Sequence, residues 1–335
     1  MGPRRGAPGG VALTPAGGPV AFGLLASGMK PQGMPPAAEF RRLGARVEEL
    51  GYDSLWVADR IASGSQGSPL LEGVAALGAF VGFTHRIRLG TSVLVAPPRQ
   101  PAILAKQLAT LDFLSGGRLT VGLGLGENPY DYAAAEVPFQ RRGRRVEEVI
   151  GVLRGAWAGG PTRYQGRQHD IPEVWLEPGP CRPGGPPLWI GAQADAAVKR
   201  AGRLADGWIG FQVTPDRYAE RLAMARAAAV EAGRDADVFG AALMIPALVR
   251  ADGGAARLEA QESFGRRFRR EIPMQAIEEM CAVGDPDDCV RKLAAYAAAG
   301  VREVILSPLA WSLDPVGDAD VLYREVVEPA RLAVR

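Results

Sequence analysis

Short apolar runs and helical segments alternate from Val20 to the end of the chain, and this alternation limits the fold more than any other feature. The apolar runs suit strands that are buried on both faces of a parallel sheet. Strands are expected at Val20–Ala26, Ser54–Ala58, Ile87–Val95, Arg118–Gly124, Pro187–Gly191, Gly207–Gln212, Phe239–Val249 and Glu303–Ser307. Helices are expected at Ala37–Leu50, Leu70–Thr84, Pro101–Leu114, Arg141–Ala158, Ala194–Leu204, Pro215–Ala232, Asp285–Ala299 and Ala319–Val334.

The stretch from Arg86 to Glu127 shows how these elements connect. Pro101 begins its helix, where the missing N–H costs nothing, and the glycine pair after Ser115 ends it. A second buried strand follows, which makes a right-handed crossover unit. Units of this kind, repeated over 335 residues, predict an α/β fold, namely a (β/α)8 TIM barrel. A doubly wound sheet is the weaker alternative, because no GxGxxG follows the first strand.

The barrel is expected to form one domain over residues 19–335. Residues 1–18 are rich in Gly and Pro and predict a disordered leader. Loop insertions are expected at about 128–140, 159–186 and 251–273, at the C-terminal face of the barrel. The last contains the basic run GRRFRREI at 265–272, which indicates a solvated helix face or, alternatively, a contact for an anionic ligand.

The composition favours a small-molecule partner. Lys and Arg number 39 and Asp and Glu number 37, so the net charge of +2 gives no indication of nucleic-acid binding. Cys181, Cys281 and Cys289 lack the spacing of a zinc site or a disulfide framework, and a reduced cytoplasm is the expected compartment. No apolar run approaches the roughly 18 residues that a membrane span needs, so no membrane contact is expected.

Four separated motifs carry a resemblance to a known family. They are GYDSLWVADR at 51–60, RIRLGTSVLVAP at 86–97, LATLDFLSGGRLTVGLGLGE at 108–127 and PLWIGAQADAAVKRAGRLADGWIG at 187–210. Together they resemble the bacterial luciferase-like monooxygenase superfamily, and within it the actinobacterial branch that depends on the deazaflavin coenzyme F-420. The resemblance implies a luciferase-like barrel that carries a flavin or deazaflavin at the C-terminal ends of its strands.

The resemblance also implies which residues contact the cofactor. In this family the third strand carries a non-proline cis peptide behind the ring, and Ser92 and Val93 stand at the matching positions. At the end of the fifth strand, the start of the next helix would face a phosphate with free N–H groups, and Asp195 is expected to cap that helix. The expected cofactor contacts are Asp59, Thr91, Ser92, Val93, Gly124, Gly126, Asn128, Gly191, Ala192 and Gln193.

Glu127 is the main candidate for proton transfer. It matches the glutamate that deazaflavin-dependent sugar-phosphate dehydrogenases use beside the reactive carbon of the cofactor. A carboxyl group buried beside an aromatic ring has a raised pKa, which suits acid–base work. The alternatives for Glu127 are a cap on the following turn or an ion pair with Arg141 or Arg142. Tyr130 and Tyr132 follow closely and are the expected substrate contacts.

Asp59 and Arg60 are the other two candidates for catalysis. Asp59 matches a family position that touches the cofactor ring, and an ion pair with Arg60 or another basic neighbour is the alternative. Arg60 stands where many relatives have a histidine. Because the pKa of an arginine exceeds about 12, Arg60 cannot shuttle protons near neutral pH. It can hold an anionic substrate or stabilise negative charge on a reduced ring.

Three functions are compatible with these residues. The first is hydride transfer between coenzyme F-420 and a small organic substrate. The second is an FMN-dependent monooxygenase that receives reduced flavin from a partner reductase and activates oxygen. The third is a flavin-binding barrel without catalytic activity. Relatives commonly form homodimers through the second and third helices, and the apolar run Gly73–Phe83 is compatible with such a homodimer.

Overall fold

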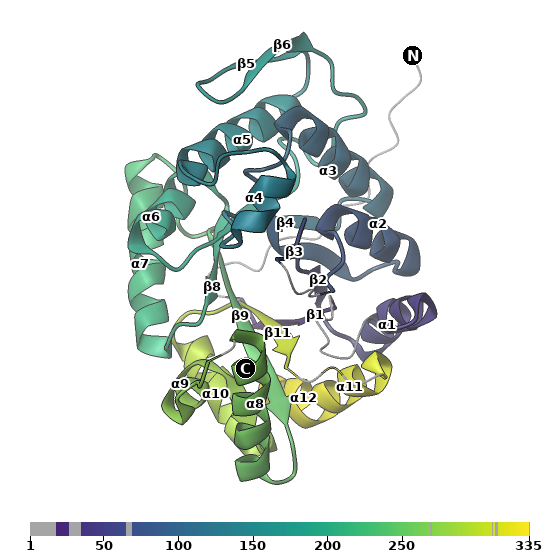
Figure 1. The fold of residues 1–335 in the computed structure, drawn as a ribbon, viewed down its shortest axis with the longest axis vertical. Helices are drawn as coiled ribbons and strands as arrows, with labels where there is room; N and C mark the ends of the chain where they lie inside the picture. Colours follow the sequence, from purple (N-terminus) through teal and green to yellow (C-terminus); the bar gives the residue numbers. More distant parts are fainter. Residues whose placement is uncertain are drawn as a thin grey trace.

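The structure is a computed structural model, and it describes residues 18–26, 35–64, 69–268, 270–309, 311 and 314–334. Parallel strands form a ring inside a layer of helices (Figure 1). The strands of the ring are β1 (Ala21–Leu25), β2 (Ser54–Val57), β3 (Arg88–Val95), β4 (Leu119–Gly124), β7 (Leu188–Gly191), β8 (Gly207–Phe211), β9 (Gly240–Val249) and β11 (Glu303–Pro308). The ring is closed, because β8 pairs with β9, β9 pairs with β11, and β11 pairs with β1. The expected (β/α)8 barrel and all its strands are confirmed.

The outer helices also follow the expected order, with only their ends shifted. They are α1 (Ala37–Leu50), α2 (Gly73–Phe83), α3 (Pro101–Ser115), α5 (Arg142–Trp157), α6 (Asp195–Leu204), α7 (Pro215–Glu231) and α10 (Pro286–Ala298). The last expected helix is divided into α11 (Pro315–Leu322), a π-helical turn η1 (Tyr323–Val327) and α12 (Glu328–Ala333). Pro329 removes one N–H donor at this division, which favours the wider π turn.

The segments expected as insertions contain regular structure. The first holds the short helix α4 (Pro129–Ala134), and the second holds an antiparallel hairpin of β5 (Thr162–Gln165) and β6 (Asp170–Val174). Figure 1 shows α4 inside the ring of outer helices, whereas the hairpin lies beyond α5. The leader expected at 1–18 falls, apart from residue 18, outside the described residues.

The expectation of a loop at 251–273 is wrong. Most of this segment forms α8 (Gly253–Phe268), and α9 (Met274–Met280) and the short strand β10 (Ala282–Gly284) follow. Ala256, Ala260 and Phe264 recur at helical spacing and are buried in one apolar cluster with Val283. The basic run at the end of α8 agrees with its simpler interpretation, because Arg266 is exposed and pairs with a glutamate of the same helix.

Two tryptophans fill the inside of the barrel. The rings of Trp56 and Trp189 are stacked, with 5.7 Å between their centroids. Glycines on other strands of the barrel make room for them, since a Cβ atom would lie 2.4 Å from Trp56 at Gly90 and 2.6 Å from Trp189 at Gly240. The barrel interior is therefore a packed core, and a site for ligands belongs at the ends of the strands.

Candidate active site

The barrel mouth is the end formed by the C-terminal residues of the strands and the loops that follow them. At this end, β3 carries the backbone irregularity that the resemblance implies, because the peptide bond between Ser92 and Val93 is cis. The pairing of β3 with β4 shifts between Thr91 and Leu94. Thr91 Oγ1 donates a hydrogen bond of 2.7 Å to the carbonyl oxygen of Gly122. Ser92 Oγ is buried and has no partner among the described residues.

Two of the glycines expected near the cofactor make room for Val93. A Cβ atom would lie 2.3 Å from a methyl group of Val93 at Gly124, and 2.7 Å from one at Gly191. Gly126 has a left-handed φ of 68°, and a Cβ atom there would lie 2.7 Å from Val95. Glycine is therefore required at these positions by the protein's own packing against the end of β3.

Asp59 lies at the end of β2, and its side chain is fully buried. Its carboxylate accepts hydrogen bonds from the backbone N–H groups of Gly73, at 2.7 Å, and Val95, at 2.9 Å. It also pairs with Arg99, whose Nη2 lies 2.8 Å from Oδ2. Burial raises the pKa of Asp59, and the positive charge of Arg99 opposes this shift. The ion pair expected as the alternative for Asp59 therefore exists, with Arg99 in place of Arg60.

Arg99 was not among the residues selected from the sequence, although it follows β3 closely. Its Nε donates to the carbonyl oxygen of Val95 at 3.2 Å, and its Nη1 lies 2.7 Å from Glu72, which caps α2. Asp59 and Arg99 together bind both backbone groups of Val95. This pair fixes the end of β3, two residues beyond the cis peptide bond, against β2 and the start of α2.

Arg60 is half-buried and has no hydrogen bond or ion pair with any described residue. The loop that follows it is nevertheless well anchored. Asp131 Oδ1 accepts from the N–H groups of Ile61 and Ala62 at 2.8 and 2.9 Å, and Asn128 Nδ2 donates to the carbonyl oxygen of Ala62 at 2.7 Å. The loops after β2 and β4 are thus joined, and beside that junction the guanidinium group of Arg60 has no partner among the described residues.

Glu127 follows β4 at the mouth and is exposed, so the burial expected for it is not present. It forms no hydrogen bond or ion pair within the described part of the chain, and neither alternative role is found. The helix α4 is capped instead by Asn128, whose Oδ1 accepts from the N–H of Tyr130 at 3.2 Å. Glu127 is therefore a solvent-exposed carboxylate, without a partner among the described residues, just beyond the C-terminal end of β4.

The two tyrosines of α4 differ in solvent exposure. Tyr132 is buried, its ring packs edge-on against Phe139, and its hydroxyl donates to the carbonyl oxygen of Leu125. Burial raises the pKa of Tyr132 to about 12. Tyr130 is 51% exposed. Of the two expected substrate contacts, only Tyr130 has a surface that a ligand can reach in this structure.

The residues after β7 lead into the start of α6. The carbonyl oxygen of Ala192 accepts from Trp208 Nε1 at 2.9 Å, which ties this turn to β8. Gln193 is exposed, and its amide donates to the carbonyl oxygen of Phe211 at 3.3 Å and to Gln212 at 3.2 Å. The turn is therefore held in place from the side of β8.

The expectation that Asp195 caps α6 is wrong. The residue at the cap position is Ala194, which offers no side-chain hydrogen bond, and Asp195 is the first residue of the helix. Its carboxylate pairs with Arg217 at 3.0 Å and with Arg221 at 3.3 Å, because α7 brings both arginines to it. No described side chain caps the first turn of α6, and free N–H groups at a helix start suit a phosphate.

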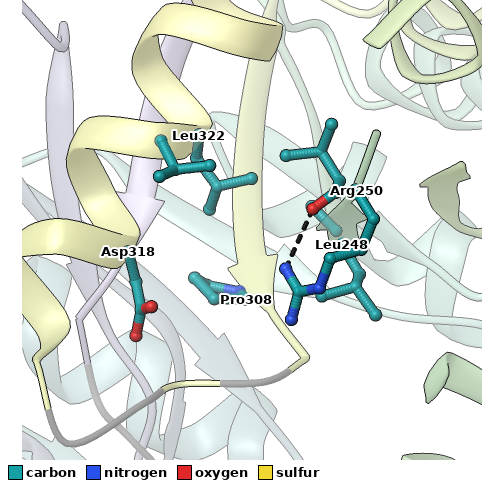
Figure 2. Close-up of a pocket in the computed structure, with 8 residues that line it drawn as sticks. Leu248, Arg250, Pro308, Asp318 and Leu322 are labelled. Atoms are coloured by element: carbon teal, nitrogen blue, oxygen red, sulfur yellow. Dashed lines mark hydrogen bonds between the residues drawn. The ribbon is translucent and has the colours of Figure 1, made fainter. Parts of the chain in front are cut away.

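A small cavity lies apart from these residues (Figure 2). Its volume is about 70 Å³, and it lies between the ends of β9 and β11 and the helix α11. Figure 2 shows Arg250 and Asp318 on opposite sides of Pro308. None of the residues discussed above lines it. No described helix is long and apolar enough to span a membrane, and no described group of His, Cys, Asp and Glu side chains is arranged to hold a metal.

Comparison with known proteins agrees with this geometry. The model of the luciferase-like monooxygenase family matches residues 20–303. An F420-dependent glucose-6-phosphate dehydrogenase of Microbacterium testaceum is 28% identical over 80% of this chain and 86% of its own. Two solved structures share the fold, each with a TM-score of 0.79. One is an F420-dependent secondary alcohol dehydrogenase, with 20% identity over 95% of this chain and 99% of its own. The other is the monooxygenase RslO1 of Streptomyces bottropensis, with 22% identity over 92% of this chain and 99% of its own. The chain therefore belongs to the luciferase-like monooxygenase family of oxidoreductases.

Proposed function

We propose that this oxidoreductase transfers a hydride between coenzyme F-420 and a small organic substrate at the barrel mouth. The observation that carries the proposal is the unpartnered Ser92 Oγ in the irregular part of β3. A buried hydroxyl without a partner is costly, and a ligand group in contact with β3 would supply one. The similarity to F420-dependent relatives favours a deazaflavin for this position.

The residues around the mouth fit such a cofactor. Thr91, Ser92 and Val93 would lie behind its ring, and Gly124, Gly126 and Asn128 would line the same side. The turn Gly191–Gln193 and the uncapped start of α6 would face a phosphate. When bound, the deazaflavin supplies the hydride chemistry, while the protein positions it and excludes water.

We assign distinct tasks to the charged residues. Glu127 exchanges the proton that accompanies the hydride, because its carboxylate is free at the mouth. Arg60 holds an anionic group of the substrate or balances negative charge on the reduced ring, since no described residue neutralises it. Asp59 acts as a positioning residue, because its buried carboxylate is fully engaged with backbone and Arg99.

We also propose a homodimer formed through α2 and α3. The whole of α2, Gly73–Phe83, lacks charged residues, and its outward side presents small residues such as Ala75 and Ala79. On α3, Ile103 is 60% exposed and Leu114 is 63% exposed. An outer helix of a barrel normally has a polar outward face, so an apolar one indicates a protein partner. The free thiols suit the cytoplasm as the compartment.

Two parallel assays test the proposed reaction. Both use one panel of secondary alcohols and sugar phosphates, the substrates that the relatives' names indicate. The first follows the absorbance of F-420 without oxygen, and the second follows oxygen consumption with reduced FMN from a reductase. We expect turnover in the F-420 assay. Turnover confined to the oxygen-consuming assay would replace the proposal with the FMN-dependent monooxygenase.

A further inference from the structure

The side chain of Asp131, in the first turn of α4, binds a loop that is distant in the sequence. Its Oδ1 accepts from the backbone N–H groups of Ile61 at 2.8 Å and Ala62 at 2.9 Å, which are 70 and 69 residues away. Asn128 Nδ2 donates to the carbonyl oxygen of Ala62 at 2.7 Å. Both backbone polar groups of Ala62 are therefore bound by side chains that follow β4.

The helix dipole does not explain the surroundings of Asp131. An acidic residue in the first turn of a helix commonly stabilises the positive end of the dipole from an exposed position. Asp131 is only 2% exposed, and Asn128 already caps α4 by accepting from the N–H of Tyr130. Burial of a carboxylate is costly unless hydrogen bonds compensate for it, and bonds to a charged acceptor are strong. The buried carboxylate therefore indicates a firm link between α4 and the loop after β2.

The same short helix is also fixed to the end of β4. A helix of six residues is not stable on its own, so tertiary contacts must hold α4 in place. Tyr132 is buried, and its hydroxyl donates to the carbonyl oxygen of Leu125, the residue after β4. On the other side, the ring of Tyr130 lies so close to Gly64 that a Cβ atom there would be 2.6 Å away. The helix α4 therefore bridges the end of β4 and the loop after β2 (Figure 1).

Arg60 lies between two anchored residues of that loop. The carboxylate of Asp59, which precedes it, binds two backbone N–H groups and Arg99. The N–H of Ile61, which follows it, is bound by Asp131. The backbone that carries Arg60 is therefore fixed on both sides, whereas its guanidinium group has no partner among the described residues. A cation that is held at its base and not neutralised suits the recognition of an anionic group.

We propose that Asp131, together with Asn128, is a positioning residue that holds Arg60 at a fixed place relative to Glu127. Glu127 directly precedes Asn128, so the bridge connects the loop of Arg60 to the residue that exchanges the proton. A small misplacement of a group that holds the substrate slows a reaction strongly. The task of Arg60 rests on the proposed function, but the hold of Asp131 on the loop after β2 does not.

Hydrogen exchange and steady-state kinetics of Asp131→Ala test the two parts of the proposal. We expect the amides of Ile61 and Ala62 to exchange about tenfold faster or more, because both lose their acceptor. With the best substrate of the panel, we expect kcat/KM to fall about tenfold or more, while F-420 affinity changes by less than about twofold. Asp131→Asn keeps an acceptor oxygen, so both quantities should stay within about threefold of the wild type.

The matched control is Glu48→Ala, at the opposite end of the barrel. Glu48 of α1 also holds a distant loop, because its carboxylate accepts from the three successive N–H groups of residues 85–87 before β3. We expect this variant to lose stability to urea, as Asp131→Ala does, but to keep kcat/KM within about twofold. An equal loss of kcat/KM in both variants would reduce the role of Asp131 to general stability and overturn the proposal.

A double-mutant cycle shows whether Asp131 acts through Arg60. It compares Arg60→Gln, Asp131→Ala and the double variant. We expect the double variant to have the kcat/KM of Arg60→Gln within about threefold, because a loop without its functional side chain has nothing left to position. Losses that multiply would mean that Asp131 acts on another part of the site, and they would overturn the proposal.

The remaining outcomes separate this proposal from the proposed function. Wild-type protein without turnover in the F-420 assay contradicts the proposed function, and the cycle is then measured in the oxygen-consuming assay with FMN. Without turnover in either assay, exchange decides, and an unchanged rate for Ile61 and Ala62 in Asp131→Ala would overturn the proposal. If that variant does not fold, unchanged exchange of Ala62 in Asn128→Ala would overturn it.

Discussion

At the scale of single residues, we propose different roles for Glu127 and Asp59, although both are carboxylates near one mouth. Glu127 is exposed and has no partner in the described part of the chain, whereas Asp59 is buried and accepts from two backbone groups and Arg99. A carboxylate that must exchange a proton needs access to the reacting ligand. A carboxylate that joins the ends of two strands, as Asp59 joins β2 and β3, needs to be buried between them. The surroundings, rather than the residue type, assign the roles.

The substitution Glu127→Gln tests the proton-transfer role. We expect turnover to fall by about two orders of magnitude or more, which is the usual scale of acid–base catalysis. We expect F-420 affinity to change little, because the amide keeps the shape of the side chain. Steady-state kinetics and fluorescence titration measure the two effects. Glu136→Gln, at another exposed glutamate after the same strand, is the control, and equal turnover in both variants would remove Glu127 from the mechanism.

The substitution Asp59→Asn tests the positioning role. It replaces the charged acceptor of two backbone N–H groups by an amide and leaves Arg99 paired with Glu72 alone, so we expect the unfolding free energy to fall by about 1.5 to 3 kcal/mol. Urea denaturation measures this loss. The control Glu262→Gln breaks an exposed pair with Arg266, which is expected to cost less than about 1 kcal/mol. An Asp59→Asn variant that kept its unfolding free energy but lost turnover would contradict the positioning role and indicate that Asp59 is a catalytic residue.

At the scale of secondary structure, the end of β3 depends on glycines of its neighbours. The substitution Gly124→Ala would place a Cβ atom 2.3 Å from a methyl group of Val93. We expect it to cost about 1 to 3 kcal/mol of unfolding free energy, as overpacking does, and to weaken cofactor binding. Gly155→Ala, where the new Cβ would have only an ordinary contact at 3.6 Å, should be neutral or stabilising by up to about 1 kcal/mol. Equal effects of the two substitutions would contradict this role of Gly124.

The elements show what periodicity can and cannot predict. All barrel strands were predicted, because runs buried on both faces differ clearly from their surroundings. The helix α8 was missed, since its apolar residues Ala256, Ala260 and Phe264 are few and its other face is charged. The prediction that Asp195 caps α6 was wrong because its carboxylate pairs with Arg217 and Arg221. These arginines lie more than 20 residues away in the sequence, and only the fold brings them near.

One feature of the candidate site, its cis peptide bond, was predictable from the motifs, whereas the hydrogen bonds and ion pairs between its residues were not. The cis bond at Ser92–Val93 followed from the resemblance and is present. The pairing of Asp59 with Arg99 and the tie between Asp131 and the loop after β2 join residues 40 or more positions apart. Exposure was equally unpredictable for Glu127, because it depends on how the loop after β4 leaves the barrel.

At the scale of the whole molecule, the apolar outer side of α2 predicts a homodimer. The substitution Ala79→Arg would place a charge in the proposed interface, and we expect a dimer to become a monomer. Light scattering coupled to size-exclusion chromatography measures the mass. Val230→Arg, at a position of α7 that is 63% exposed, is the control and should remain dimeric. A monomeric wild-type protein would refute the homodimer.

Coenzyme F-420 is the cofactor that we propose for the barrel mouth of this luciferase-like chain. The most direct measurement is fluorescence titration of the purified wild-type protein with F-420 and, in parallel, with FMN, each oxidised and reduced. We expect saturable micromolar binding of F-420 that is tighter than the binding of FMN. Micromolar binding of FMN with no binding of F-420 would contradict it.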